Sequence, residues 1–116
     1  MSNLRLVVNN NIRKKERELF FVKRELQSIL NLYFKMVSNG KWKDYSVSTG
    51  SKEISFDVYQ RASDKPVLRI LKNLKPSNFN EKFLVKDKNG NVIEKSENLN
   101  RLLTSTSWNN IKIKNS

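Results

Sequence analysis

Hydrophobic and polar residues follow a helical pattern between residues 19 and 37, in the segment LFFVKRELQSILNLYFKMV. It is the longest apolar-rich stretch of the chain, and its polar residues fall on the side opposite the apolar ones. We therefore expect a helix from about Lys23 to about Val37, ended by Ser38-Asn39-Gly40, where Asn39 or Gly40 can adopt the left-handed conformation of a helix C-terminus. The apolar stripe of this helix comprises Leu26, Ile29, Leu30, Tyr33 and Val37.

The four residues 19–22, Leu-Phe-Phe-Val, have two interpretations. As a first helical turn they would place Phe20 on the polar side of the stripe. As a short strand covered on both faces they would bury four consecutive apolar residues, which suits their aromatic and β-branched side chains. The strand is favoured, with the helix beginning after it.

The rest of the chain shows short alternating runs separated by turn residues, which is the pattern of antiparallel strands. The residues Asp87-Lys88-Asn89-Gly90 predict a hairpin with a type I′ turn, and Ser96 is the expected N-cap of a short helix with Leu99, Leu102 and Leu103 inward. The predicted strands cover residues 45–48, 54–58, 67–71, 83–85 and 92–93.

These elements predict an α+β fold, with one long helix packed on an antiparallel meander of four or five strands and a short C-terminal helix. We expect a basic N-terminal extension at 1–18, a single α+β domain at 19–104 and a polar tail at 105–116. One hydrophobic cluster should contain Leu26, Ile29, Leu30, Tyr33, Phe56, Val58 and Ile70.

Composition removes several classes of site. The 116 residues include no cysteine and no histidine, which excludes disulfides, thiolate metal sites and the commonest general base. No apolar run is long enough to span a bilayer, and the N-terminus lacks the cleavage pattern of a signal peptide, so a cytoplasmic location is expected. The carboxylates are scattered and no serine or threonine has a base beside it, so we expect neither catalysis nor a cofactor nor a metal.

The chain carries 23 Lys and Arg against 11 Asp and Glu, a net charge of +12. Such an excess favours a polyanionic partner. Lysine and asparagine are both abundant, so an AT-rich coding bias is the competing explanation. That bias accounts for lysine in place of arginine, but less well for the excess of bases over acids.

A set of spaced motifs between residues 24 and 70 carries a family resemblance. These motifs are Arg24-Glu25-Leu26, Ile29-Leu30, Leu32-Tyr33, Met36-Val37, Gly40, Trp42, Asp44-Tyr45, Phe56, Val58, Arg61-Ala62-Ser63, Pro66 and Arg69-Ile70. With them the chain resembles a family of short alphaproteobacterial proteins catalogued as a domain of unknown function. The resemblance covers about Phe20–Thr104 and is strongest over Arg24–Ile70, and it implies no known activity, cofactor or partner. Phe34 stands where the family usually has glycine, and Val22 where it usually has a capping aspartate.

Two segments are candidates for nucleic-acid binding. Lys41 and Lys43 flank Trp42, which could stack on a base with phosphate contacts on either side; alternatively Trp42 folds over the core at the helix end. The second candidate is a basic arm that would order on a phosphate backbone, or else remain a solvated extension. The arm comprises Arg13, Lys14, Lys15 and Arg17.

A further set of charged residues surrounds the helix and the first strands. It forms either a structural ion-pair network, since a charge near a core is normally paired, or an anion site built on arginine guanidinium groups. The set comprises Arg24, Glu25, Asp44, Arg61 and Arg69.

The leading functional hypothesis is therefore a non-enzymatic module that binds RNA or DNA through phosphate contacts. The alternative is an adaptor whose sheet face or edge binds an acidic protein, and a third possibility is half of a homodimer completed through an open sheet edge. A continuous basic stripe would favour nucleic acid. An exposed apolar patch rimmed with charge, for instance around Phe20, Phe34 or Trp108, would favour a protein partner.

Overall fold

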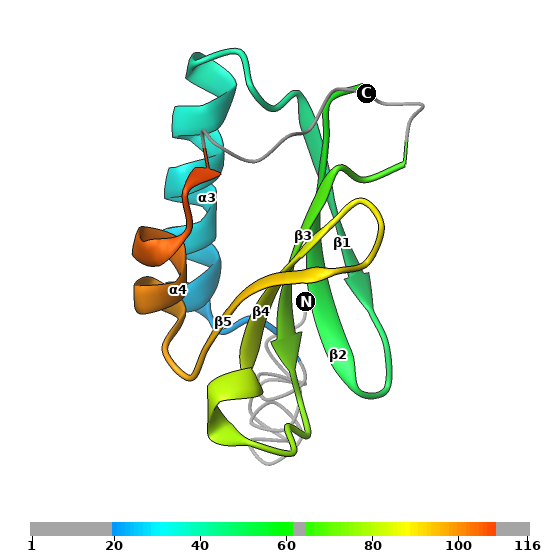
Figure 1. The fold of residues 1–116 in the computed structure, drawn as a ribbon. Helices are drawn as coiled ribbons and strands as arrows, with labels where there is room; N and C mark the ends of the chain where they lie inside the picture. Colours follow the sequence, from blue (N-terminus) through cyan, green and yellow to red (C-terminus); the bar gives the residue numbers. More distant parts are fainter. Residues whose placement is uncertain (1–19, 62–64, 109–116) are drawn as a thin grey trace, which may run out of the picture.

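A five-stranded antiparallel sheet forms one layer of the fold, with strand order β1-β2-β3-β4-β5, and the α-helices form the other (Figure 1). The computed structural model describes residues 20–61 and 65–108. Each strand pairs with the next one along the chain, so the sheet is a meander, and the predicted α+β class is confirmed. The elements are α3 (Lys23–Ser38), β1 (Asp44–Thr49), β2 (Glu53–Tyr59), β3 (Leu68–Asn73), the 3₁₀ helix η1 (Phe79–Glu81), β4 (Phe83–Asp87), β5 (Val92–Ser96) and α4 (Leu99–Ser105).

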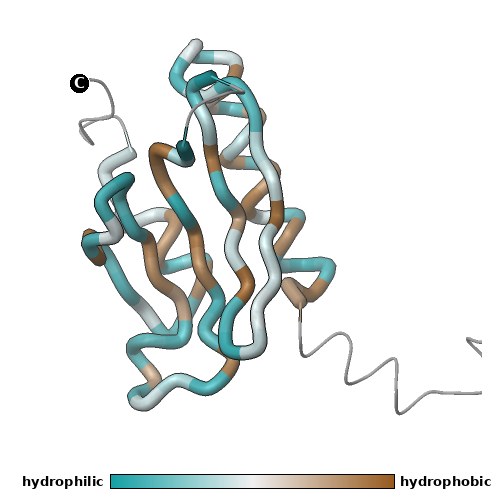
Figure 2. The backbone as a smooth tube through the Cα atoms, turned by 90° about the vertical axis from the view of Figure 1, so that its right-hand side faces the viewer, coloured by the Kyte–Doolittle hydropathy of each residue, from teal (hydrophilic) through white to brown (hydrophobic). Residues whose placement is uncertain are grey.

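Both α-helices cover the same face of the sheet. Figure 2 looks onto the opposite face, where no helix lies in front of the strands. Alternation along β2 directs Ile54, Phe56 and Val58 toward the helices, where all three are fully buried. The predicted cluster is confirmed: Ile29, Tyr33, Phe56, Val58 and Ile70 form part of the core, and Leu26 and Leu30 pack against it half-buried.

Helix α3 begins at Lys23 as predicted, but the strand predicted before it is wrong. Phe20 to Val22 form an irregular segment in which Phe21 is buried and Phe20 is exposed, so only one side of this segment is covered. Val22 offers no capping side chain. Its backbone N–H instead donates to Glu25 Oε1 at 2.8 Å, so the carboxylate secures the start of the helix from inside the first turn.

The end of α3 follows the prediction. Gly40 adopts a φ of +77°, a conformation in which a side chain would be strained. Its N–H donates to Val37 O at 2.9 Å, and Lys41 N–H donates to Met36 O at 2.9 Å, which is the bonding pattern of a Schellman motif. The apolar stripe shifts by one residue here, because Met36 is buried and Val37 is exposed.

The β4–β5 hairpin is confirmed, but its turn is not of type I′. Asn89 has negative φ, and only Gly90 is positive, at +88°. The Asp87 carboxylate accepts from the N–H groups of Asn89 and Asn91, both at 2.9 Å, which stabilises a turn with negative φ at its centre. The φ values of a type I′ turn are therefore not adopted.

Helix α4 begins two residues later than a Ser96 cap would require. Asn98 is its N-cap, and Asn98 Oδ1 accepts from Arg101 N–H at 2.9 Å, while Ser96 Oγ accepts from Asn98 N–H. The packed region continues to Trp108, past the predicted boundary at 104, because Thr106 and Trp108 are both buried. Within the described ranges, neither α-helix has the length and apolar character needed to cross a membrane.

Candidate functional site

Trp42 lies in the core rather than on the surface. Its side chain is 2% exposed, and its ring meets the ring of Trp108 edge to face, with centroids 5.7 Å apart. The interpretation of Trp42 as a base-stacking residue is therefore wrong, and its alternative as a residue that covers the core at the end of α3 describes the structure. Lys41 and Lys43 remain exposed on either side of it.

An exposed apolar surface lies where α3 approaches β1. Phe34 and Val47 are 59% and 45% exposed, and Val37 and Tyr45 are also exposed. Buried Tyr33 joins the helix to the strand, because its ring packs edge-on against both Phe34 and Tyr45, at centroid distances of 5.6 and 4.9 Å. We call the four exposed residues, Phe34, Val37, Tyr45 and Val47, the β1 edge surface.

Tyr33 also fixes the start of β1, because its hydroxyl donates to Lys43 O at 3.3 Å. Burial raises the pKa of Tyr33 above its ordinary value of 10.0, and the Asp44 carboxylate and Tyr45 raise it further. The hydroxyl therefore stays protonated at neutral pH and keeps its role as a donor.

β1 is an edge strand of the sheet. All six of its residues pair in register with β2, and its other side has no strand partner in the described part of the chain. It contains no proline, no lysine and no bulge, which are the features that normally prevent pairing with another chain. The opposite edge is different: the β4–β5 register shifts between Val85 and Lys86, and β5 carries Glu94 and Lys95.

The ends of β1 are basic. Lys41 and Lys43 precede the strand and Lys52 follows it, all three exposed. Asp44 is the one acidic residue in the stretch from Lys41 to Lys52. The middle of the β1 edge surface is therefore apolar, and exposed lysines stand before and after the strand, Lys52 with the exposed Glu53 directly after it.

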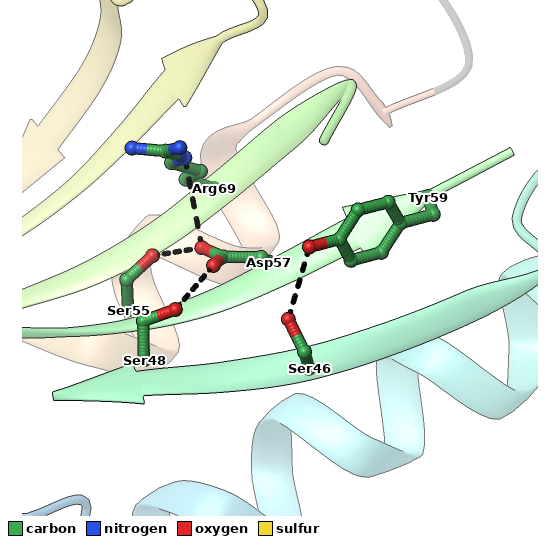
Figure 3. Close-up of polar contacts among 6 residues, drawn as sticks. All are labelled: Ser46, Ser48, Ser55, Asp57, Tyr59 and Arg69. Atoms are coloured by element: carbon green, nitrogen blue, oxygen red, sulfur yellow. Dashed lines mark hydrogen bonds and ion pairs between the residues drawn. The ribbon is translucent and has the colours of Figure 1, made fainter. Parts of the chain in front are cut away.

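A polar cluster occupies the face of the sheet that the helices leave open (Figure 3). Its centre is Asp57, which is 3% exposed and accepts hydrogen bonds from Ser48 Oγ, at 2.8 Å, and from Ser55 Oγ. Arg69 Nε lies 3.7 Å from Asp57 Oδ1. Ser46 Oγ and Tyr59 Oη form a separate hydrogen bond at 3.1 Å. The buried carboxylate is thus fully partnered, as a buried charge requires.

The five charged residues grouped in the sequence do not form one network. Glu25 pairs with Lys72, which lies on the helix side of the sheet, with Nζ 2.8 Å from Oε1. Lys72 Nζ also donates to Phe20 O at 3.1 Å, so it ties the segment before α3 to β3. Arg69 pairs with Asp57 on the other face, so Glu25 and Arg69 do not meet.

The other members of that group stay at the surface. Arg24 and Arg61 are exposed, and the exposed Asp44 carboxylate accepts from Tyr45 N–H. Arg24 lines a shallow polar cleft of about 270 Å³ between the starts of α3 and α4. The arginines therefore do not build the predicted common anion site. The basic arm, Arg13, Lys14, Lys15 and Arg17, lies outside the described residues.

Sequence reasoning missed Lys72, although a signal for it exists, and it did not predict the burial of Asp57. Lys72 lies at the same alternate positions of β3 as Leu68 and Ile70, so its side chain points to the buried side of the sheet. A buried ammonium group needs a carboxylate or other acceptor there. Asp57 has the opposite parity to Phe56 and Val58, so its exposure was the natural expectation. Within residues 20–61 and 65–108 no group of three acidic side chains is arranged to hold a metal ion.

Replacing Arg69 by Ala should lower the free energy of unfolding by roughly 1 kcal/mol, because Asp57 keeps its two serine donors but loses its cationic partner. Arg61→Ala removes the same charge from an exposed position and should leave the stability unchanged. Thermal melts of the two variants check this difference. Equal melting temperatures would contradict a structural role for the Arg69–Asp57 pair.

A protein-family model matches residues 19–103, a range that contains all five strands, α3 and most of α4. The matching family is described as a protein of unknown function, DUF2794. Comparison with curated proteins and with solved structures gives no significant match. The family match confirms the resemblance inferred from the motifs between Arg24 and Ile70. The chain belongs to the DUF2794 family of unknown function.

Proposed function

We propose that this protein is an interaction module that binds an extended acidic segment of a partner protein along the outer edge of β1. The observation that carries the proposal is the edge itself: a six-residue strand in regular register, unprotected by proline, lysine or bulge. An added strand would satisfy the outward backbone groups of β1, as in other cases of strand addition.

The side chains beside the edge favour such a partner. Tyr45 and Val47 point to the helix side of β1 and are exposed there, and the Tyr45 ring contacts Tyr33, which also packs against Phe34. Apolar residues at alternate positions of an incoming strand would lie against them, because side chains on one face repeat every second residue. Burial of this apolar area would supply affinity, and the backbone pairing would set the orientation.

The charge selects an acidic partner over a second copy of the chain. Lys41, Lys43 and Lys52 stand at the two ends of β1. An acidic segment neutralises them, whereas an antiparallel pair of β1 strands would bring two sets of these lysines together. Like charges across an interface are unfavourable, so homodimerisation through β1 is the weaker interpretation.

The proposal can be tested by selecting displayed random peptides against the full chain. We expect the selected peptides to alternate apolar and acidic residues. Their binding should shift the backbone amide signals of β1 in an NMR titration. Val47→Lys should weaken the best peptide by about tenfold or more, equivalent to about 1.4 kcal/mol, because it places a lysine in the apolar contact. Phe79→Lys changes another exposed apolar residue away from this edge and is the matched control.

Two results would contradict this function. Selected peptides without acidic residues would remove the charge argument, and equal binding by the Val47→Lys and Phe79→Lys variants would place the contact elsewhere. Sedimentation of the protein alone tests homodimerisation through β1. If the protein is a dimer and Val47→Lys dissociates it, a second copy of the chain occupies the edge.

Nucleic-acid binding remains the second candidate, favoured by the net charge of +12 and by the exposed Lys41 and Lys43. Fluorescence anisotropy with short RNA and DNA over a salt series separates it from the first. Contacts to about four to six phosphates would give a log–log salt slope of roughly −3 to −5. Affinity weaker than roughly 100 μM at cellular salt would exclude it.

A further inference from the structure

We infer that the open face of the sheet, between β3 and β5, binds a small organic oxyanion: a carboxylate or phosphate group attached to an apolar body about the size of one ring. This site is on the face opposite α3 and does not depend on the β1 edge. The inference rests on a pair of cations that the fold places side by side and on the hollow that adjoins them.

Arg69 and Lys86 are direct cross-strand neighbours in the β3–β4 register, so their side chains leave the same face of the sheet. Like charges in this arrangement repel and are destabilising. Arg69 contacts Asp57 through Nε, which leaves Nη1 and Nη2 with no protein partner among the described residues. Lys86 is half-buried and makes no ion pair within that part of the chain.

The hollow of about 520 Å³ next to Lys86 is lined by the apolar side chains of Leu84, Val92 and Ile93. Of its two carboxylates, Glu81 pairs with Lys95 at 3.9 Å, and Glu94 accepts a hydrogen bond from Ser105 Oγ at 3.3 Å. Lys86 is thus the cation in this hollow that lacks a counter-ion among the described residues. An anion at its mouth would neutralise it.

The cations Arg69 and Lys86 match the anionic half of such a ligand, and the hollow matches its apolar half. Asp57, 3% exposed and fixed by two serine hydroxyls, holds Arg69 by Nε, so the outer edge of the guanidinium presents two parallel N–H groups. A carboxylate or phosphate accepts such a pair in bidentate geometry. Lys86 adds a point charge beside it, and the hollow takes the apolar body.

The test is an NMR titration of the full chain with phenyl phosphate, benzoate, inorganic phosphate and phenol. Phenyl phosphate or benzoate should saturate the amide shifts of β3, β4 and β5, roughly tenfold more tightly than inorganic phosphate because the ring is buried. Phenol lacks the anionic group, so its addition should not lead to saturation of these amide shifts. A phosphate preference or a carboxylate preference then identifies the head group.

Lys86→Gln should weaken phenyl phosphate binding at least about tenfold. Arg69→Lys, which keeps the charge but lacks the guanidinium fork, should weaken it as well. Lys75→Gln makes the same change of charge as Lys86→Gln at an exposed loop position and should have no effect. Equal losses in the Lys75 and Lys86 variants, or inorganic phosphate binding as tightly as phenyl phosphate, would overturn the inference.

Melting temperatures, measured without and with ligand, provide a readout that binding assays do not. Lys86→Gln relieves the repulsion from Arg69, so it should raise the melting temperature at low salt, and Lys75→Gln should not. Phenyl phosphate should raise the melting temperature of the unaltered protein and not that of Lys86→Gln. A lower melting temperature for Lys86→Gln would show that Lys86 serves the fold and not a ligand.

Discussion

Trp42→Ala is expected to lower the free energy of unfolding by about 3–5 kcal/mol, the range for removing a large aromatic side chain from a core. Trp42 is 2% exposed and contacts both Tyr33 and Trp108, with ring centroids 6.2 and 5.7 Å away. Its loss would therefore open a cavity between the end of α3 and the segment after α4. Chemical denaturation monitored by circular dichroism measures the change.

Trp42→Phe is the matched control for this substitution. Trp42 Nε1 is buried and has no hydrogen-bond partner among the described residues, so phenylalanine removes an unpaired donor while it keeps most of the ring. We expect a loss well below that of Trp42→Ala, because an unpaired buried polar group contributes no stability. A Trp42→Ala protein that melts normally but no longer binds single-stranded RNA would return Trp42 to the role of a stacking residue.

Lys72→Met is expected to cost about 2–3 kcal/mol, because it leaves the Glu25 carboxylate without its cationic partner. The cost stays below the 3–5 kcal/mol of a fully buried pair, since the Glu25 side chain is 18% exposed and keeps the Val22 N–H as a donor. The substitution also removes the bond from Lys72 Nζ to Phe20 O, which should loosen the segment before α3.

The double variant Glu25→Leu, Lys72→Met isolates the pair. Replacing both charges by apolar side chains removes the stranded carboxylate, so the double variant should be more stable than Lys72→Met alone. Hydrogen exchange at the first turn of α3 gives a local readout in the same samples. Additive losses from the two single substitutions would show that Glu25 and Lys72 do not depend on each other.

The sequence predicted the fold class because each strand carries its own signal. Ile54, Phe56 and Val58 alternate with polar residues, and glycine marks both the end of α3 and the β4–β5 turn. The segment at 19–22 misled because four apolar residues in a row indicate burial without saying what covers them. Among its described residues, 20–22, Phe21 alone is buried, and α3 starts at Lys23.

The site was harder to predict because it depends on which strands are neighbours. Alternation assigns a face to Arg69 and to Lys86, but only the register brings them opposite each other. Nor does periodicity reveal that β1 is an edge, since a central strand would show a similar run of Tyr, Ser, Val and Thr. Trp42 lies beside two lysines in the chain, and its burial depends on Trp108, which packs against it from beyond α4.

The meander has a consequence for folding kinetics. Because every strand pairs with its neighbour in the chain, each pairing closes a short loop, and the sheet has a low contact order for a β-rich structure. Such topologies reach the native state faster than sheets that pair strands distant in sequence. The contacts of α3 with β3 and with α4 are the long-range part of the fold, since they join residues far apart in the chain. We expect the four hairpin pairings to form in the transition state and the docking of α4 on α3 to follow it, so that φ-values fall from the centre of the sheet toward α4.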